Sequence, residues 1–152
     1  MFEQRSEAYE YEEESLARGP SYILPPRGTR LAGVEASCRV LRPLITHGHR
    51  EQVLVAYVDA NVECLHISRH LGWAASADVP VSEIITSAAH LGAAGVILAH
   101  NHPSGSPSPS RADINITRKV QDCLLALDIT LLDHLIFYGD SGCTSMRQAQ
   151  IL

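Results

Sequence analysis

The sequence is poor in aromatic residues and has no excess of basic residues. Phe, Trp and Tyr together make up 5% of its 152 residues, and 12 Lys and Arg stand against 17 Asp and Glu. Nucleic-acid-binding domains are usually basic, so the net charge of −5 argues against that class of function. No apolar run approaches the roughly 20 residues needed to cross a bilayer, so no membrane-spanning helix is expected.

Export signals and closely spaced cysteine pairs are also missing. The N-terminus lacks the charged, apolar and small-residue regions of a signal peptide, which predicts a cytoplasmic location. None of the four cysteines, Cys38, Cys64, Cys123 and Cys143, belongs to a CxxC motif. In a cytoplasmic protein they are expected to be reduced thiols, with a disulfide or a cysteine-bound zinc as the alternative.

The negative charge is concentrated at the N-terminus. Residues 1–15 contain six glutamates and one arginine, so they account for the whole net charge and the rest of the chain is balanced. Residues 1–29 are rich in Glu, Tyr, Pro and Gly and show no sustained periodicity. They are predicted to form a flexible acidic arm that precedes one domain over residues 30–152.

The apolar pattern predicts an α/β fold with helices packed around a mixed sheet. Helical spacing predicts helices over residues 31–42, from Val81 to a stop at Gly92, and from Ile116 to Leu127. Buried or β-branched runs predict strands over residues 53–58, 62–68, 95–99 and 129–138, and a short last strand after residues 140–142. Residues 69–79, which include Trp73, are expected to form a connection.

Residues 100–113, HNHPSGSPSPSRAD, contain the clearest candidate for chemistry. His100 and His102 lie two residues apart at the end of a predicted strand, so their side chains share one face. After a proline-rich loop, Ser110 is suited to cap the next helix, and Asp113 lies in its first turn. Two imidazoles and a carboxylate that meet at a strand end could bind a zinc ion.

Each part of this motif also has an ordinary structural explanation. A Pro/Ser-rich stretch is usually only a loop, and Ser110-x-x-Asp113 resembles a capping box. The combination at this spacing nevertheless favours a metal site. A second HxH, His47-Gly48-His49, has no S-x-x-D after it and is predicted to be a surface loop. Asn101 and its neighbours after His102 could shape a substrate groove or fix the loop, and fixing the loop is preferred.

The pattern H-x-H-x(7)-S-x-x-D resembles the signature of the JAB/MPN metalloproteases, also called JAMM. The sequence ILAHNHPSGSPSPSRADI is similar to the corresponding sequence of their RadC-like branch. The same is true of REQVLVAYVD (residues 50–59) and LLDHLIF (residues 131–137). The resemblance extends from about residue 35 to residue 147. It implies a cytidine-deaminase-like α/β core, the JAB/MPN fold, with a mixed sheet flanked by helices and one bound zinc ion.

By position, the resemblance implies that His100, His102 and Asp113 are the zinc ligands. It also implies that Glu51 is the general base and that Ser110 stabilises the oxyanion. His134 is a candidate for orienting a ligand. The alternative is a histidine of a strand whose hydrogen bonds are satisfied within the fold and that has no role in the site. Three protein ligands leave one position for water, as in catalytic zinc sites. The implied reaction is hydrolysis of an amide or isopeptide bond in a peptide or protein.

Rival functions stay open beside this hypothesis. A DNA-repair or mobile-element accessory protein, a non-catalytic MPN scaffold and a two-His, one-carboxylate iron site each fit part of the pattern. The helix-hairpin-helix region usual in RadC-like proteins has no counterpart in this sequence, which weakens the DNA-binding alternative. Residues 77–85 also differ from the sequence that RadC-like proteins usually have at this point, so Ser82 and Glu83 receive no role. The substrate and the oligomeric state cannot be read from the motif.

Overall fold

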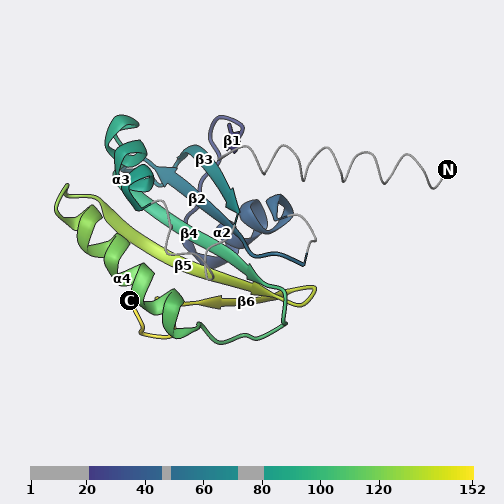
Figure 1. The fold of residues 1–152 in the computed structure, drawn as a ribbon. Coiled ribbons are helices and arrows are strands. Elements are labelled where there is room, and N and C mark those ends of the chain that lie inside the picture. The colour runs from purple at the N-terminus through teal and green to yellow at the C-terminus, as the bar shows by residue number, and fades with distance from the viewer. Residues whose placement is uncertain (1–20, 46–48, 72–80) are drawn as a thin grey trace.

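A six-stranded mixed sheet forms the centre of the protein, and helices pack on both of its faces (Figure 1). The computed structural model describes residues 21–45, 49–71 and 81–152. The predictions for residues 1–20, for His47 and Gly48, and for most of the connection around Trp73 lie outside these residues.

The strands lie in the order β1-β3-β2-β4-β5-β6. Neighbouring strands are antiparallel except β4 and β5, which are parallel, so the predicted mixed sheet is confirmed. A parallel pair needs a crossover connection, which α4 (Arg111–Leu125) provides. The strand bounds are β1 Ser21–Ile23, β2 Gln52–Val58, β3 Cys64–Leu71, β4 Gly95–His102, β5 Thr130–Tyr138 and β6 Gly142–Ser145.

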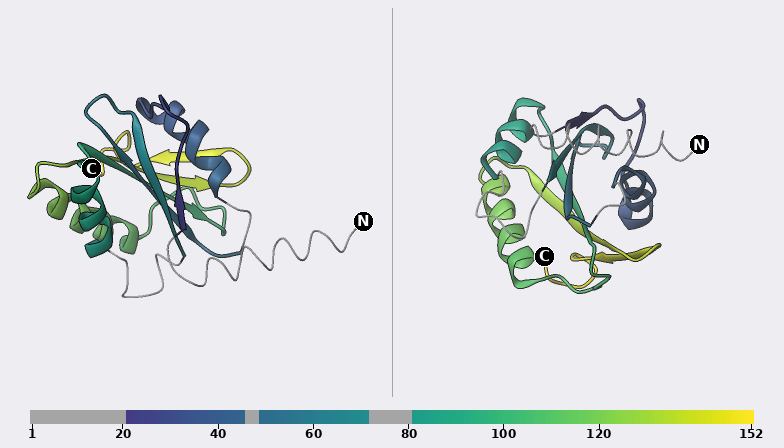
Figure 2. Two further views of the ribbon diagram at one scale, coloured as in Figure 1. Left: turned by 90° about the horizontal axis from the view of Figure 1, so that it is seen from above. Right: turned by 45° about the vertical axis from the view of Figure 1, so that its right-hand side comes forward.

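The helices divide the core into two layers. Helices α3 (Val81–His90) and α4 cover one face of the sheet, and α2 (Gly33–Leu41) covers the other (Figure 2). The predicted first helix is shorter than expected, because the chain continues from α2 into the 3-10 turn η1 (Arg42–Leu44), which contains Pro43. Among the described residues, no helix combines the length and the hydropathy needed to cross a membrane.

Strand β2 lies inside the sheet and is buried on both faces. Its residues alternate between the two layers: Val53 and Val55 pack with α3 and α4, whereas Leu54 and Ala56 pack on the α2 side. A strand covered on both faces is continuously apolar, which explains the unbroken run that predicted it.

Residues 21–30 join the sheet, although the sequence predicted residues up to 29 to be part of a flexible arm. Ser21–Ile23, assigned to the arm by composition, forms β1 and pairs with β3 at the edge of the sheet. Thr29 then closes a turn onto the carbonyl of Pro26, and Arg30 forms a bridge with Glu63. The prediction of an arm up to residue 29 was therefore wrong for residues 21–29, because strand pairing here depends on backbone hydrogen bonds that composition does not encode.

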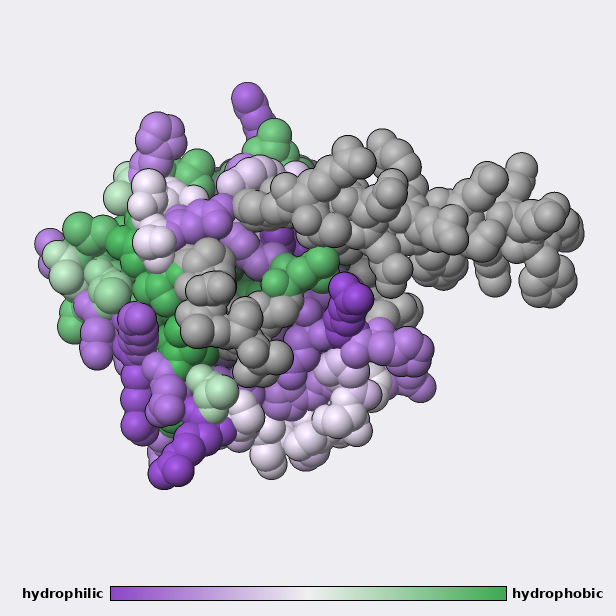
Figure 3. All heavy atoms as spheres, in the orientation of Figure 1, coloured by the Kyte–Doolittle hydropathy of each residue, from purple (hydrophilic) through white to green (hydrophobic). Residues whose placement is uncertain are grey.

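The loop between β4 and α4, residues 103–110, lies at the carboxyl end of β4. Ligand sites of open α/β sheets are commonly found at such ends. In the orientation of Figure 1, the surface near this loop carries mostly pale and purple residues, which are weakly to strongly hydrophilic (Figure 3).

Candidate metal centre

Strand β4 carries both candidate histidines on the face covered by α3 and α4. Val96 and Leu98 point into that layer, and the same alternation brings His100 and His102 to it at the end of the strand. His100 is fully buried and His102 is 8% exposed. The apolar face of the strand thus ends in two buried imidazoles.

The first turn of α4 supplies the carboxylate. Ser110 caps the helix by accepting a hydrogen bond from the Asp113 N–H at 3.1 Å, and the Ser110 N–H donates to Asp113 Oδ2 at 2.7 Å. This is the capping box that the sequence suggested as a purely structural explanation for Ser110 and Asp113. The capping and metal-site explanations are compatible, because the box uses only one of the two carboxylate oxygens.

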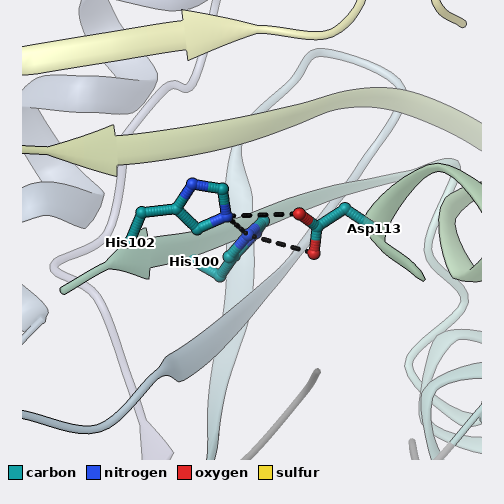
Figure 4. Close-up of side chains that lie close together, drawn as sticks. All are labelled: His100, His102 and Asp113. Atoms are coloured by element: carbon teal, nitrogen blue, oxygen red, sulfur yellow. Dashed lines mark hydrogen bonds and ion pairs between the residues drawn. The ribbon is translucent and has the colours of Figure 1, made fainter. Parts of the chain in front are cut away.

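The three side chains converge on one point (Figure 4). The two Nε2 atoms of His100 and His102 lie 2.9 Å apart. Asp113 Oδ1 lies 3.3 Å from His100 Nε2, and Asp113 Oδ2 lies 3.2 Å from His102 Nε2. Ligands bonded at about 2.0–2.1 Å to a tetrahedral zinc ion lie about 3.3 Å from one another. The spacing of these atoms therefore fits one such ion.

A buried hydrogen-bond chain behind His100 determines which of its nitrogens carries the proton. The Thr117 hydroxyl lies 2.5 Å from the Asp113 carbonyl oxygen, which can only accept, so the hydroxyl donates there. Thr117 Oγ1 must then accept from His134 Nδ1, at 2.6 Å. His134 Nε2 in turn accepts from His100 Nδ1, at 2.7 Å. We assign His100 the tautomer with its lone pair on Nε2, because the proton sits on Nδ1.

His102 is oriented in the same way by a backbone group. Its Nδ1 lies 2.9 Å from the Ser106 carbonyl oxygen and therefore donates to it. The Nε2 lone pairs of His100 and His102 thus face each other and the carboxylate of Asp113. Buried lone pairs at these distances repel one another unless a cation, either a metal ion or a proton, lies between them.

Two groups of the cluster have pKa values shifted from their usual ones. Burial opposes ionisation of Asp113, but the interactions with His100 and Ser110 outweigh it and lower the pKa of this carboxyl below its usual value. Burial is the main reason why the pKa of His134 lies well below the usual histidine value, so this ring is neutral. Asp113 Oδ1 is buried and accepts no hydrogen bond from the described residues. A cation at the centre of the cluster would satisfy that oxygen.

Glu51 lies immediately before β2, on the strand next to the histidines. In the β2–β4 register Val53 pairs with His100, and Glu51 precedes Val53 by two residues. Glu51 is partly exposed, and its Oε2 is buried with no hydrogen-bond partner among the described residues. The ladder between β2 and β4 ends at the pair Val53 and His100, so the role that the motif match gives Glu51 stays a prediction.

Asn101 holds the backbone on both sides of Glu51. Its Oδ1 accepts from the Gln52 N–H at 2.7 Å, and its Nδ2 donates to the Arg50 carbonyl at 3.2 Å. Sequence reasoning assigned Asn101 to fixing its own loop and missed this link to the next strand. The position between the two histidines was the available signal, because alternation turns Asn101 away from the face that they share.

A β-bulge directs His134 into the site. Val96 pairs with Leu131 and Ile97 with Asp133, so Leu132 is an extra residue in β5. Leu131 and His134 are three apart and would point to opposite faces of a regular strand, yet both face the α3/α4 side. Bulges are common beside functional sites because they re-aim side chains. The neighbouring Asp133 binds Ser145 and Arg147 instead.

Comparison with known proteins identifies the family of this chain. A family model described as the RadC-like JAB domain matches residues 31–151. A relative from Carboxydothermus hydrogenoformans, named "UPF0758 protein", is 39% identical over 112 residues, which cover 73% of this chain and 49% of that protein. This chain therefore spans about half the length of that curated relative. The chain belongs to the RadC-like JAB domain family, which confirms the resemblance seen in its sequence.

Proposed function

We propose that this RadC-like JAB protein is a zinc-dependent hydrolase that cleaves an amide or isopeptide bond in a peptide or protein. One observation carries the proposal: the Nε2 atoms of His100 and His102 lie 2.9 Å apart, and each lies 3.2–3.3 Å from a carboxylate oxygen of Asp113, a spacing that a shared zinc ion would fit. The donor set of two neutral histidines and one carboxylate is one that catalytic zinc sites use, with the fourth position left for water.

His100, His102 and Asp113 are the proposed ligands, and each is held from behind. His134 and Thr117 orient His100, the Ser106 carbonyl orients His102, and the capping box orients Asp113. Such outer partners fix the geometry and the basicity of ligands. A zinc ion at this position supplies Lewis acidity and lowers the pKa of a bound water to about 7.

Glu51 is the proposed general base, which takes the proton of the attacking water and passes it to the leaving amine. Its buried Oε2, with no hydrogen-bond donor among the described residues, supports this role because such an oxygen can accept that proton. Asn101 would keep Glu51 in place through the two flanking backbone groups. The hydroxyl of Ser110 accepts from Asp113 and still has its own hydrogen to donate to a developing oxyanion.

The proposal is tested by metal analysis and peptide-library cleavage on the same preparations. Wild type should contain one zinc per chain and cleave a subset of peptides. Glu51→Gln should keep the zinc and lose cleavage, because an amide cannot take the proton. Glu35→Gln is the matched control, since Glu35 is an exposed residue of α2 on the other face of the sheet and should leave both properties unchanged.

Two of the alternative functions, the iron site and the scaffold, have their own outcomes in this experiment. Stoichiometric iron instead of zinc would favour oxygen chemistry at the same three ligands. Zinc without cleavage of any peptide, and without an effect of Glu51→Gln, would favour a scaffold. If His100→Ala left the metal content unchanged, the ligand assignment itself would be wrong.

A further inference from the structure

Cys38 and Cys143 lie in contact, far from the metal centre in sequence and on the other side of the sheet. Cys38 belongs to α2 and Cys143 to β6, and their Sγ atoms are 2.9 Å apart. Both side chains are partly buried against the core layer beneath α2. The sulfurs of a disulfide are about 2.05 Å apart, so bond formation needs an approach of about 0.9 Å.

Arg42 holds the same two parts of the chain together independently of the cysteines. Its guanidinium donates to the Gly142 carbonyl and stacks 4.6 Å from the centre of the Phe137 ring. Gly142 precedes Cys143, and Phe137 pairs with Cys143 across the β5–β6 ladder. These contacts hold the β5–β6 hairpin against the end of α2, so the two thiols meet without a rearrangement of the backbone.

We propose that Cys38 and Cys143 are an oxidisable dithiol site, which a small-molecule disulfide such as oxidised glutathione converts into an intramolecular disulfide. The other two cysteines do not share this arrangement. Cys64 is buried and donates to the His66 carbonyl, and its pKa is raised to about 11, first by burial. Cys123 belongs to α4 and packs against the layer on the opposite face of the sheet.

The reaction is a thiol–disulfide exchange in two steps. Burial and the neighbouring Cys38 sulfur raise the pKa of Cys143 to about 12, which disfavours Cys143 as the first nucleophile. The Cys38 thiolate attacks one sulfur of oxidised glutathione and releases one glutathione thiolate. Cys143 then loses its proton to solvent and attacks the Cys38 sulfur, which releases the second glutathione. Two protein thiols are oxidised, and one glutathione disulfide is reduced to two thiols.

The disulfide between Cys38 and Cys143 would anchor strand β6 at the open edge of the sheet. β6 is four residues long and pairs only with β5 among the described residues. Short edge strands open readily, and a covalent tie from Cys143 to α2 would oppose that opening. The oxidised protein should therefore show slower amide hydrogen exchange in residues 142–145 than the reduced protein.

The experiment incubates the full chain with oxidised glutathione and counts free thiols by alkylation and intact mass. We expect four thiols to fall to two, with a mass loss of two hydrogens and no retained glutathione. Trypsin leaves Cys123 and Cys143 on one peptide, because no Lys or Arg separates them. A second cleavage before Asp140 separates them, and the linked pair should then join a Cys38 peptide to a Cys143 peptide.

Serine variants separate the pair from general oxidation. Cys38→Ser and Cys143→Ser should each lose the intramolecular product, whereas Cys123→Ser, the matched control, should still lose two thiols. The wild-type peptide map decides the matter even if one variant folds poorly. Four remaining thiols, stable glutathione adducts, links between chains, or a link that contains Cys64 or Cys123 would each overturn the proposal.

Discussion

Replacing Thr117 with valine tests the hydrogen-bond chain behind His100. Thr117 is fully buried, and its hydroxyl donates to the Asp113 carbonyl at 2.5 Å and accepts from His134 at 2.6 Å. Valine has nearly the same shape and the same branching at Cβ, so the substitution removes these two hydrogen bonds with little change in packing. His134 Nδ1 then loses the hydrogen bond to the Thr117 hydroxyl, which in wild type fixes its proton on that nitrogen.

The size of the effect follows from these contacts. A buried donor that loses its partner costs about 1–3 kcal/mol of folding free energy. His134 would also be able to carry its proton on Nε2, which would place a proton on His100 Nε2 and compete with the metal. Loss of a group that orients a metal ligand typically lowers metal affinity by about 10–100-fold, which is about 1.4–2.7 kcal/mol of binding free energy.

Two measurements separate folding from binding. Urea unfolding of the chelator-treated protein gives the loss of stability, and competition with a chromophoric chelator gives the zinc affinity. Thr117→Ser keeps the hydroxyl and should keep most of the affinity. Thr130→Val makes the same chemical change at an exposed position of β5 and should alter neither quantity. If Thr117→Val bound zinc as tightly as wild type, the tautomer assignment for His100 would be refuted.

Three further predictions concern the metal, acid and Asn101. Zinc at 100 times its dissociation constant should stabilise the folded chain by about 2.7 kcal/mol. Calorimetry should then show a higher unfolding temperature with zinc. A chelator should reverse this increase, and His100→Ala should abolish it. Burial lowers the pKa of His70, so between that lowered pKa and about pH 6.5 the folded state binds fewer protons than the unfolded state. Within this window, stability should fall with falling pH by up to about 1.4 kcal/mol per pH unit. Urea unfolding of metal-free wild type and His70→Gln should show a smaller pH slope in the variant. Asn101→Ala should retain zinc and lower kcat in the peptide assay, because the backbone around Glu51 loses two hydrogen bonds.

Each of these predictions has an outcome that contradicts it. An unfolding temperature that zinc raises equally in His100→Ala would mean that the ion binds elsewhere. An identical pH slope in wild type and His70→Gln would mean that another group causes the acid sensitivity. An Asn101→Ala variant with unchanged kcat, or one that loses its zinc, would show that Asn101 does not act through Glu51.

Local patterns in the sequence were enough to predict that His100, His102 and Asp113 lie together. The positions of His100 and His102 follow from alternation along one strand, and the position of Asp113 follows from the capping box of the next helix. Both patterns depend on residues at most three apart. The strands and helices around them were predicted for the same reason, although β4 runs on to His102 and β3 begins at Cys64, later than expected.

His134 was a candidate for orienting a ligand, but its contact with His100 and the other partners of these side chains could not be derived, because they depend on how separate strands align. The bulge at Leu132 has no marker in the sequence, yet it turns His134 toward His100. The link from Asn101 to the backbone around Glu51 exists only because β2 lies beside β4 in one register. The contact between Cys38 and Cys143 joins residues 105 apart and depends on α2 covering the end of the β5–β6 hairpin.

Asp113 shows why the candidate metal centre and the fold are difficult to separate. Its Oδ2 accepts the Ser110 N–H and so completes the cap of α4, while its Oδ1 accepts no hydrogen bond from the described residues and faces His100. The positive end of the helix dipole favours the ionised carboxylate, which is also the form that a cation requires. Because α4 is the crossover from β4 to the parallel strand β5, its N-terminus starts close to the carboxyl end of β4. The same connection that makes the sheet mixed therefore brings the carboxylate to the two histidines.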